Sequence, residues 1–301
     1  MKKKLYLLAS ILLVIGILTA CGSNKGSGNN NASGNNSGNE AKEAKQTFDV
    51  QKVEVTPTEL TGENIDRIKE KGEIVLGTSA EYPPYEWHII DGAEDEIVGV
   101  DLEIAKVVAE KLGVELKVSD MQFDGLLAAL QTGDIDFVIA GMVITETRKQ
   151  AADFSEPYFE QGQDIVIKKV DEDKFKTIDD LAGKKIGVQL GTTQQEYAEA
   201  NFDAEIVAIP NNNNMIMELK NGSLDAVFMT NYPAEQFRSR SPEDLMVVDF
   251  DIPNEDGSGI AVKKGNSDLL AVMNEAVEEI KAANAIESWF DTFMKLSEET
   301  E

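Results

Sequence analysis

Hydrophobic residues recur along most of the chain in two spacings, one typical of strands and one typical of helices. The segment Glu73–Thr78 has the pattern of a strand, and the apolar run 135–139 is typical of a strand buried on both faces of a parallel sheet. Between them, helical spacing predicts a helix that begins at Asp101 as its cap and stops at Gly113. Its apolar positions are Ile104, Ala105, Val108 and Leu112.

The alternation of strands and helices continues through two blocks, which predicts an α/β fold. In the first block we also expect a helix at 64–71, a strand pair within 86–98, a strand at 114–118 and a helix around 126–130. In the second block we expect strands at 185–188, 205–209 and 224–229, and helices at 194–200, 212–221 and 232–238. Helices at 268–283 and 286–296 close the pattern.

Two further extended segments, 164–168 and 260–263, bracket the second block and are expected to cross between the blocks. The C-terminal helices then return to the first block. We therefore predict lobe 1 from residues 61–163 with 260–301, and lobe 2 from 164–259. A hinged cleft would lie between them.

The N-terminus has the features of an export signal followed by an anchoring cysteine. A basic start and a short apolar run predict a signal peptide over residues 1–20, and Leu18-Thr19-Ala20-Cys21 resembles the lipobox of bacterial lipoproteins. That resemblance implies acylation of Cys21 and a position on the outer face of the cytoplasmic membrane, in a Gram-positive bacterium. A plain cleavage site beside an incidental cysteine is the alternative. Residues 21–60 begin with a Gly/Ser/Asn-rich stretch and are expected to form a flexible tether.

Charge and cysteine content exclude several classes of protein. Cys21 is the only cysteine, so no intramolecular disulfide and no cysteine-based metal site can form. Loss of the signal peptide removes three lysines and leaves 25 basic against 55 acidic residues, a formal charge of −30. Nucleic acid is a poor partner for such a chain. We expect neither a cofactor nor a bound metal.

Six stretches, in this order and spacing, resemble the polar amino-acid family of type 2 periplasmic-type binding proteins over about residues 63–296. They are 77–86 (GTSAEYPPYE), 98–105 (VGVDLEIA), 123–130 (FDGLLAAL), 140–148 (AGMVITETR), 153–158 (DFSEPY) and 187–194 (GVQLGTTQ). The resemblance implies a monomeric, non-enzymatic two-lobed protein that captures an amino acid or a similar small carboxylate. Its partners would be the permease and ATPase subunits of an ABC importer.

Arg148 is the candidate for carboxylate binding. Thr145 is placed to cap a helix after an apolar strand, and Arg148 follows in the first turn. A cation at the positive end of a helix is favourable when an anion lies between them. The resemblance implies that Arg148 binds the α-carboxylate, assisted by backbone amides of Ala140, Gly141 and Val143. A solvent-exposed arginine is the alternative.

Thr192, Thr193 and Gln194 supply the second lobe's candidate donors. The sequence Thr192-Thr193-Gln194-Gln195 fits a capping box at the start of a helix. The resemblance implies that the first three of these residues meet the same carboxylate. One anion would then satisfy donors of both lobes only when the cleft is closed, which is a physical reason for ligand-driven closure.

Tyr82 and Phe123 match the two aromatic positions that enclose the apolar part of the ligand in the resembled family. Packing within a core is the alternative for Phe123, because a leucine-rich helix follows it. We expect Tyr85 and Trp87 to be core residues.

Two candidate ligand contacts depart from the family pattern. Thr230 stands where many relatives place an aspartate for the ligand's ammonium group. Either Asn231, Glu81 or another carboxylate substitutes for it, or the ligand's amine is different. Ser79 stands where binders of basic amino acids place an aspartate. This departure predicts that lysine, arginine and ornithine are not ligands.

Two other classes of function use the same fold. One is a dehydratase-like enzyme, for which we find no acid/base constellation in the sequence. The other is a chemosensory ligand receptor, which would need a separate signalling partner.

Overall fold

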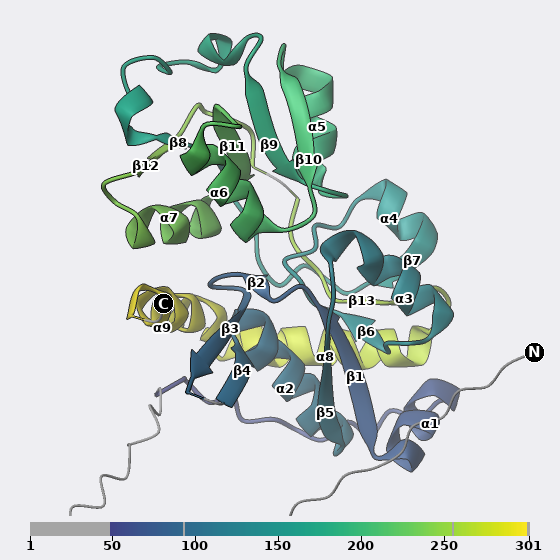
Figure 1. The fold of residues 1–301 in the computed structure, drawn as a ribbon. Helices are drawn as coiled ribbons and strands as arrows, with labels where there is room; N and C mark the ends of the chain where they lie inside the picture. The colour runs from purple at the N-terminus through teal and green to yellow at the C-terminus, as the bar shows by residue number, and fades with distance from the viewer. Residues whose placement is uncertain (1–48, 93, 255, 300–301) are drawn as a thin grey trace, which may run out of the picture. The chain divides into compact units, whose positions relative to one another are not determined.

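Two five-stranded sheets, each flanked by helices, organise the structure, which is a computed structural model (Figure 1). Residues 49–92, 94–254 and 256–299 are described. The predicted signal peptide, Cys21 and the tether up to residue 48 lie outside these ranges. We call the parts of the chain built on the two sheets lobe 1 and lobe 2. The prediction of an α/β fold is confirmed.

The sheet of lobe 1 has the strand order β5-β1-β6-β13-β7. The strand β1 pairs in parallel with β5 and β6, whereas β13 pairs antiparallel with β6 and β7. The five strands are β1 (Glu73–Thr78), β5 (Glu115–Asp120), β6 (Phe137–Val138), β7 (Ala152–Phe154) and β13 (Ala261–Lys263). A separate small sheet contains β2 (Glu81–Tyr82), β3 (Glu86–Asp91) and β4 (Glu94–Val98).

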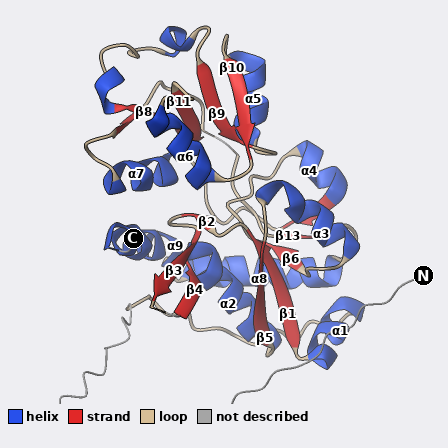
Figure 2. Ribbon diagram, viewed as in Figure 1, coloured by secondary structure: helices blue, strands red, loops and turns tan. Residues whose placement is uncertain are grey.

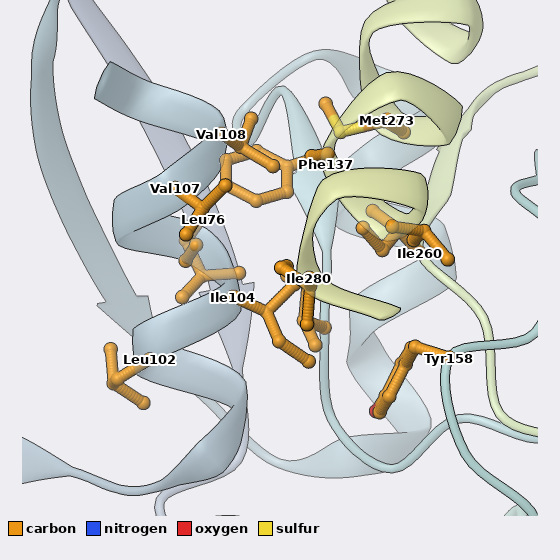
Figure 3. Packing of buried hydrophobic residues seen from close by; sticks show 14 of the residues in the cluster. Leu76, Leu102, Ile104, Val107, Val108, Phe137, Tyr158, Ile260, Met273 and Ile280 are labelled. Atoms are coloured by element: carbon orange, nitrogen blue, oxygen red, sulfur yellow. The ribbon is translucent and has the colours of Figure 1, made fainter. Parts of the chain in front are cut away.

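Successive residues of these strands point to opposite faces, and helices cover both. Leu76 and Phe137 pack with residues of α2 and α8 in one core, where Phe137 is seen between Val108 and Met273 (Figure 3). Val138 faces the other core, with Leu126 of α3. The helices of lobe 1 are α1 (Glu63–Lys71), α2 (Val100–Leu112), α3 (Leu126–Thr132), α4 (Glu146–Ala151), α8 (Ser267–Ala282) and α9 (Ala285–Glu299).

Lobe 2 repeats this layered arrangement with the strand order β10-β9-β11-β8-β12 (Figure 2). Ile186 and Phe228 face a core with α5, while Val227 faces a second core with α6 and α7. The strands are β8 (Gln163–Lys168), β9 (Lys185–Gln189), β10 (Glu205–Ile209), β11 (Ala226–Thr230) and β12 (Leu245–Val248). The helices are α5 (Thr193–Asn201), α6 (Asn212–Asn221) and α7 (Asn231–Arg240).

The chain crosses between the sheets twice, through residues 155–162 and 249–260. The two segments expected to cross instead form β8 within the sheet of lobe 2 and β13 within the sheet of lobe 1. The crossings pair with each other, since the Ser258 amide donates to the Phe159 carbonyl at 2.7 Å. The two connections therefore form one short hydrogen-bonded link.

The prediction that Asp101 caps α2 is wrong. Gly99 occupies the N-cap, and Asp101 is a completely buried residue inside the first turn. The sequence pattern was misleading because aspartate is common at both the cap and the first turn of helices. The predicted stop is confirmed, since Gly113 adopts φ 69° and closes the helix.

Residues 49–60 are not part of a free tether, although the tether was expected to extend to residue 60. Val50, Val53 and Val55 pack against the core of lobe 1. The Trp289 ring nitrogen donates to the Gln51 carbonyl at 2.8 Å. Residues 49–60 therefore form a stretch that packs against lobe 1. Within the described ranges, no helix is both long and apolar enough to cross a membrane.

Candidate ligand-binding site

A cavity with about 360 Å³ of empty space, including the part open to solvent, is lined by both lobes. Lobe 1 and the crossing segment contribute Ser79, Tyr82, Glu86, Phe123, Ala140, Gly141, Val143, Arg148 and Gln161. Lobe 2 contributes Gln189, Thr192, Thr193, Gln194 and Thr230.

Eleven of the twelve predicted ligand contacts line this cavity, and Asn231 does not. The Asn231 amide nitrogen donates to the Gly162 carbonyl at 3.1 Å, and its side-chain oxygen accepts from the Tyr232 amide. As the first residue of α7, Asn231 uses its polar groups at the helix start. Asn231 therefore lies outside the cavity lining in this structure, and its contact with a ligand stays a prediction.

Arg148 reaches the cavity from α4, and its predicted cap is present. The Thr145 hydroxyl oxygen accepts from the Arg148 amide at 3.1 Å. The guanidinium donates through Nη1 to the Val143 carbonyl at 2.7 Å, and through Nη2 to the Gly191 carbonyl of lobe 2 at 3.1 Å. It also lies 5.4 Å from the centre of the Phe123 ring. These contacts hold one cation at the boundary between the lobes.

Thr192 caps α5, so the three candidate residues of lobe 2 stand at the start of a helix. Its hydroxyl oxygen accepts from the Gln195 amide at 3.3 Å and donates to the Gln189 carbonyl at 2.7 Å. The predicted capping box is only half formed. The Gln195 side chain accepts from the Gly191 amide at 2.9 Å instead of the Thr192 amide. Helix-start amides and the guanidinium of Arg148 together suit an anionic group.

Gly141 forms the turn that follows β6, in a left-handed conformation with φ 54°. Its amide donates to Asp101 Oδ2 at 2.7 Å. Its carbonyl accepts from Gln161 Nε2 at 3.0 Å and from the Ser258 hydroxyl at 2.9 Å. We expected the Gly141 amide to assist carboxylate binding, but Asp101 already occupies it.

Tyr82 and Thr230 join the lobes on another side of the cavity. Their hydroxyl oxygens lie 2.7 Å apart, and the Thr230 amide donates to the Tyr82 hydroxyl at 3.2 Å. The Thr230 hydroxyl, a candidate acceptor for a ligand ammonium, is thus also part of a contact between the lobes. Tyr85 and Trp87 are buried in the core of lobe 1, as predicted.

Three lining residues were missed in the sequence: Glu86, Gln161 and Gln189. Glu86 lies on β3 between Tyr85 and Trp87, where simple alternation assigns it to the solvent face. It is instead only 1% exposed, because other elements cover that face too. A glutamate between two aromatic core residues is the one signal that could have drawn attention to it.

Glu86 and Asp101 form a pair of buried carboxyl groups that share a hydrogen bond beside the cavity. Burial raises the pKa of Glu86 well above its usual value, and the neighbouring Asp101 raises it further. Burial also raises the pKa of Asp101 to about 7, against the opposing effect of hydrogen bonds from Gly141 and Tyr158. The Glu86 Oε2 atom has no hydrogen-bond partner among the described residues.

Glu81 was a candidate for binding the ligand's ammonium group, but it does not line the cavity. It leaves β2 of lobe 1 and enters lobe 2, where its Oε1 accepts from the Asn212 amide at 3.0 Å and from Gln189 Nε2 at 3.3 Å. Burial raises the pKa of Glu81 to about 7, and the nearby Asp120 carboxylate adds to the rise. Glu81 is thus a buried contact between the lobes.

Replacing Glu81 with glutamine is expected to stabilise the protein at about pH 8 and to change little at about pH 5. Glutamine keeps an oxygen for the Asn212 amide but carries no charge to be buried. The folded protein holds more protons at Glu81 than the unfolded chain between about pH 4.5 and 7, so the wild type loses stability as pH rises through that window. Melting temperatures across this range would measure the difference.

Glu70→Gln is the matched control for this substitution, because Glu70 is an exposed residue of α1. It should leave the pH profile of the wild type unchanged. If the Glu81→Gln protein melted above or below the wild type by the same amount at every pH, burial of the Glu81 charge would not be the cause.

The fold and cavity describe a class of protein: two α/β lobes joined by a two-segment link, with a polar cavity between them that both lobes complete. The family model for bacterial extracellular solute-binding proteins, family 3, matches residues 74–295. The chain belongs to this family. It is therefore an extracytoplasmic binding protein and not an enzyme.

Individual relatives agree with this assignment. The chain is 32% identical over 231 residues to the L-cystine-binding protein TcyJ of Escherichia coli, covering 75% of this chain and 85% of that protein. It is 35% identical over 236 residues to the arginine-binding extracellular protein ArtP of Bacillus subtilis, covering 73% and 87%. A Streptococcus pneumoniae amino-acid ABC transporter substrate-binding protein, solved with L-arginine, has a TM-score of 0.73 at 32% identity, covering 77% of this chain and 98% of that one. The predicted membership in the amino-acid-binding proteins of ABC transporters is confirmed.

Proposed function

We propose that this protein captures an amino acid with a cationic side chain, of the arginine type, and delivers it to an ABC importer. The observation that carries the proposal is the pairing of opposite charges in one cavity. The guanidinium of Arg148, complementary to a carboxylate, and the buried carboxyl group of Glu86, complementary to a cation, both line this cavity. A zwitterion with an additional positive group is complementary to this arrangement.

The carboxylate end of the proposed ligand would lie against Arg148 and the start of α5. Arg148 bonds carbonyl oxygens of both lobes, Val143 and Gly191. A bound carboxylate would add a full negative charge to the guanidinium's partners, and a charge-assisted hydrogen bond is stronger than one to a neutral carbonyl. Thr192, Thr193 and Gln194 line the same cavity from lobe 2.

The cationic end of the proposed ligand would meet Glu86. The prediction from Ser79 that basic amino acids are excluded assumed that position 79 has to supply the carboxylate. Glu86 offers a carboxyl group in the same cavity, with one oxygen unpartnered among the described residues. Relatives whose names give arginine as the ligand support this choice. A neutral polar amino acid, which Ser79 favours, is the second candidate.

Closure of the lobes would enclose the ligand. Contacts that join the lobes around the cavity include Tyr82 with Thr230, Arg148 with Gly191, and Glu81 with Asn212 and Gln189. None of them requires a ligand, so the ligand would add to contacts that the lobes can already make. Closure would therefore need only a modest contribution from the ligand.

The N-terminal lipobox-like sequence suggests how the protein is attached to the membrane, and its family suggests which importer subunits it contacts. Acylation of Cys21 would anchor the protein to the outer face of the membrane, and the stretch up to residue 48 would act as the tether. The permease and ATPase subunits of an importer would receive the ligand from a monomeric binding protein. Labelling with a radioactive fatty acid, lost in a Cys21→Ala variant, would test the anchor.

The proposed ligand class is tested by calorimetric titration with arginine, its neutral isostere citrulline, and neutral polar amino acids including glutamine and cystine. We expect arginine to bind more tightly than citrulline by about 10- to 100-fold, the value of one charge-assisted hydrogen bond. Glu86→Gln should remove most of this difference, because it should lower the affinity for arginine and leave the affinity for citrulline unchanged.

Two results would contradict the proposal. Tighter binding of a neutral amino acid than of arginine would favour the Ser79 alternative. If Glu86→Gln lowered the affinities for arginine and citrulline equally, Glu86 would contact the α-ammonium group, which both ligands share. A melting curve of the Glu86→Gln protein verifies that it is folded.

A further inference from the structure

The carboxyl pair of Glu86 and Asp101 has an unusual arrangement for two acids beside a ligand cavity. Glu86 is 1% exposed and Asp101 is completely buried. Asp101 is held by two donors, accepting from the Gly141 amide at 2.7 Å and from the Tyr158 hydroxyl at 3.0 Å. Glu86 has an oxygen without a partner and lines the cavity. One member of the pair is therefore held by the protein, while the other is left facing the ligand space.

Arg148 is the only basic residue among the described residues that line the cavity. Its guanidinium donates to the Val143 and Gly191 carbonyl oxygens and lies over the Phe123 ring. No basic side chain is among the main causes of the raised pKa of Glu86 or Asp101. Apart from the Gly141 amide, the groups acting on the pair are acids or phenols, namely Glu81, Asp120, Tyr85 and Tyr158. Two adjacent carboxylates without a cation repel each other strongly in a buried site.

We propose that Glu86 and Asp101 share a proton when no ligand is bound, and that a cationic ligand group displaces this proton, so that ligand binding releases it to solvent. The inference rests on the proposed cationic ligand. In the free protein the shared proton cancels one negative charge. In the complex the ligand's positive group takes over that role beside Glu86, and the net charge of the site is preserved.

The titration behaviour of the two groups agrees with this assignment. Burial keeps the pKa of Glu86 well above its usual value and that of Asp101 near 7, so the free pair holds at least one proton at neutral pH. The bound state holds fewer protons than the free state. Binding of a cationic ligand should therefore tighten as pH rises, until the free pair loses the proton by itself.

The shared proton would also let the site distinguish neutral from cationic ligands. A neutral side chain cannot replace the proton, so the protonated pair would remain a neutral acid facing a neutral group. A cation releases the proton and gains a full carboxylate as its partner. The same pair can thus offer a hydrogen-bond donor to one ligand and a negative charge to another.

Proton exchange at Glu81 has to be distinguished from proton release by the pair. It is buried between the lobes and its pKa is raised to about 7, so closure of the lobes around a ligand would take up a proton there. Uptake at Glu81 has the opposite sign to release from the pair. His88, whose ring nitrogens lie 2.6 Å from Asp95 and 3.2 Å from Asp120, also titrates in this region. The test therefore uses a Glu81→Gln background and compares variants in which His88 is unchanged.

The test is calorimetric titration of arginine at about pH 7.5 in phosphate, Hepes and Tris, whose heats of ionisation differ. The dependence of the observed heat on the buffer counts the protons exchanged. In the Glu81→Gln protein we expect release approaching about one proton per arginine. The further change Glu86→Gln should reduce this number to near zero, and Glu70→Gln, an exposed control on α1, should not change it.

The outcomes separate the inference from the function on which it rests. Arginine binding with the same proton release in the presence and absence of Glu86 would overturn the proton-sharing pair and leave the function intact. Absence of arginine binding in the wild type would overturn both. If Glu86→Gln abolishes measurable binding, the pH dependence of arginine affinity tests the proton release instead. In the Glu81→Gln protein, arginine affinity should increase nearly tenfold per pH unit between about pH 7 and 8, where the pair holds one proton, and a flat profile would overturn the inference.

Discussion

Replacing Arg148 with alanine is expected to weaken ligand binding by at least about 100-fold, or about 3 kcal/mol. The side chain offers the only guanidinium among the described residues that line the cavity. Its Nη1 is oriented by the Val143 carbonyl and its Nη2 by the Gly191 carbonyl, at 2.7 and 3.1 Å. Removal would leave a ligand carboxylate buried without its charged partner. Calorimetric titration with the best ligand found by screening measures the loss.

Lys149→Ala is the matched control, because Lys149 is the next residue of the same helix. Its ammonium pairs with Glu146 at 2.8 Å on the exposed surface, away from the cavity lining. Affinity should change less than about threefold, as expected for a surface ion pair. Arg148→Lys should recover only part of the binding, since an ammonium cannot reproduce the two-pronged geometry of the guanidinium. Binding by Arg148→Ala at near wild-type affinity would refute carboxylate capture by this residue.

The second large effect is expected from Gly99→Ala, which should destabilise the fold by at least about 3 kcal/mol. Gly99 has φ 136°, and a Cβ atom there would lie 2.1 Å from the Tyr85 carbonyl oxygen and 2.9 Å from the Glu86 nitrogen. Both contacts are with backbone, which cannot move aside as a side chain can. Because this backbone leads into Glu86, the variant should also lose ligand affinity. Urea unfolding measures the change.

Gly113→Ala provides the comparison, because both glycines flank α2 and both have positive φ. Gly113 has φ 69° at the end of the helix, and nothing lies within 4 Å of its added Cβ. The expected cost is only about 1 kcal/mol, from backbone conformation alone. Equal losses for the two variants would mean that the contact with Tyr85 does not dominate the effect at Gly99.

The sequence alone predicted much of the architecture, because local patterns decide it. The alternation of strand and helix spacing predicted the α/β class and most elements to within a few residues. The cap at Thr145 and the stop at Gly113 depend on groups within a few positions of one another, and both are present. The ordered motifs also predicted most of the residues that line the cavity.

Tertiary structure decided what each polar residue does. Asp101 looks like a helix cap in the sequence, yet it is buried and holds Gly141, forty residues away along the chain. Glu86 looks exposed by alternation, yet elements distant in the sequence cover both faces of its strand. A period of two or of 3.6 residues reports the direction of a side chain within its own element. It contains no information about which distant element will cover that side chain.

The same limit applies to the carboxylate and cation ends of the cavity. Arg148 was identified from its place after a capped helix start, which is a local feature. Positions 79 and 230 offer no carboxyl group, and the structure brings the carboxyl group of Glu86 into the cavity lining. Local sequence thus determined the fold class and the capped helix start that carries Arg148. Only the packing of the two lobes determined which acids are buried beside the ligand space, because burial is a property of contacts between segments far apart in the chain.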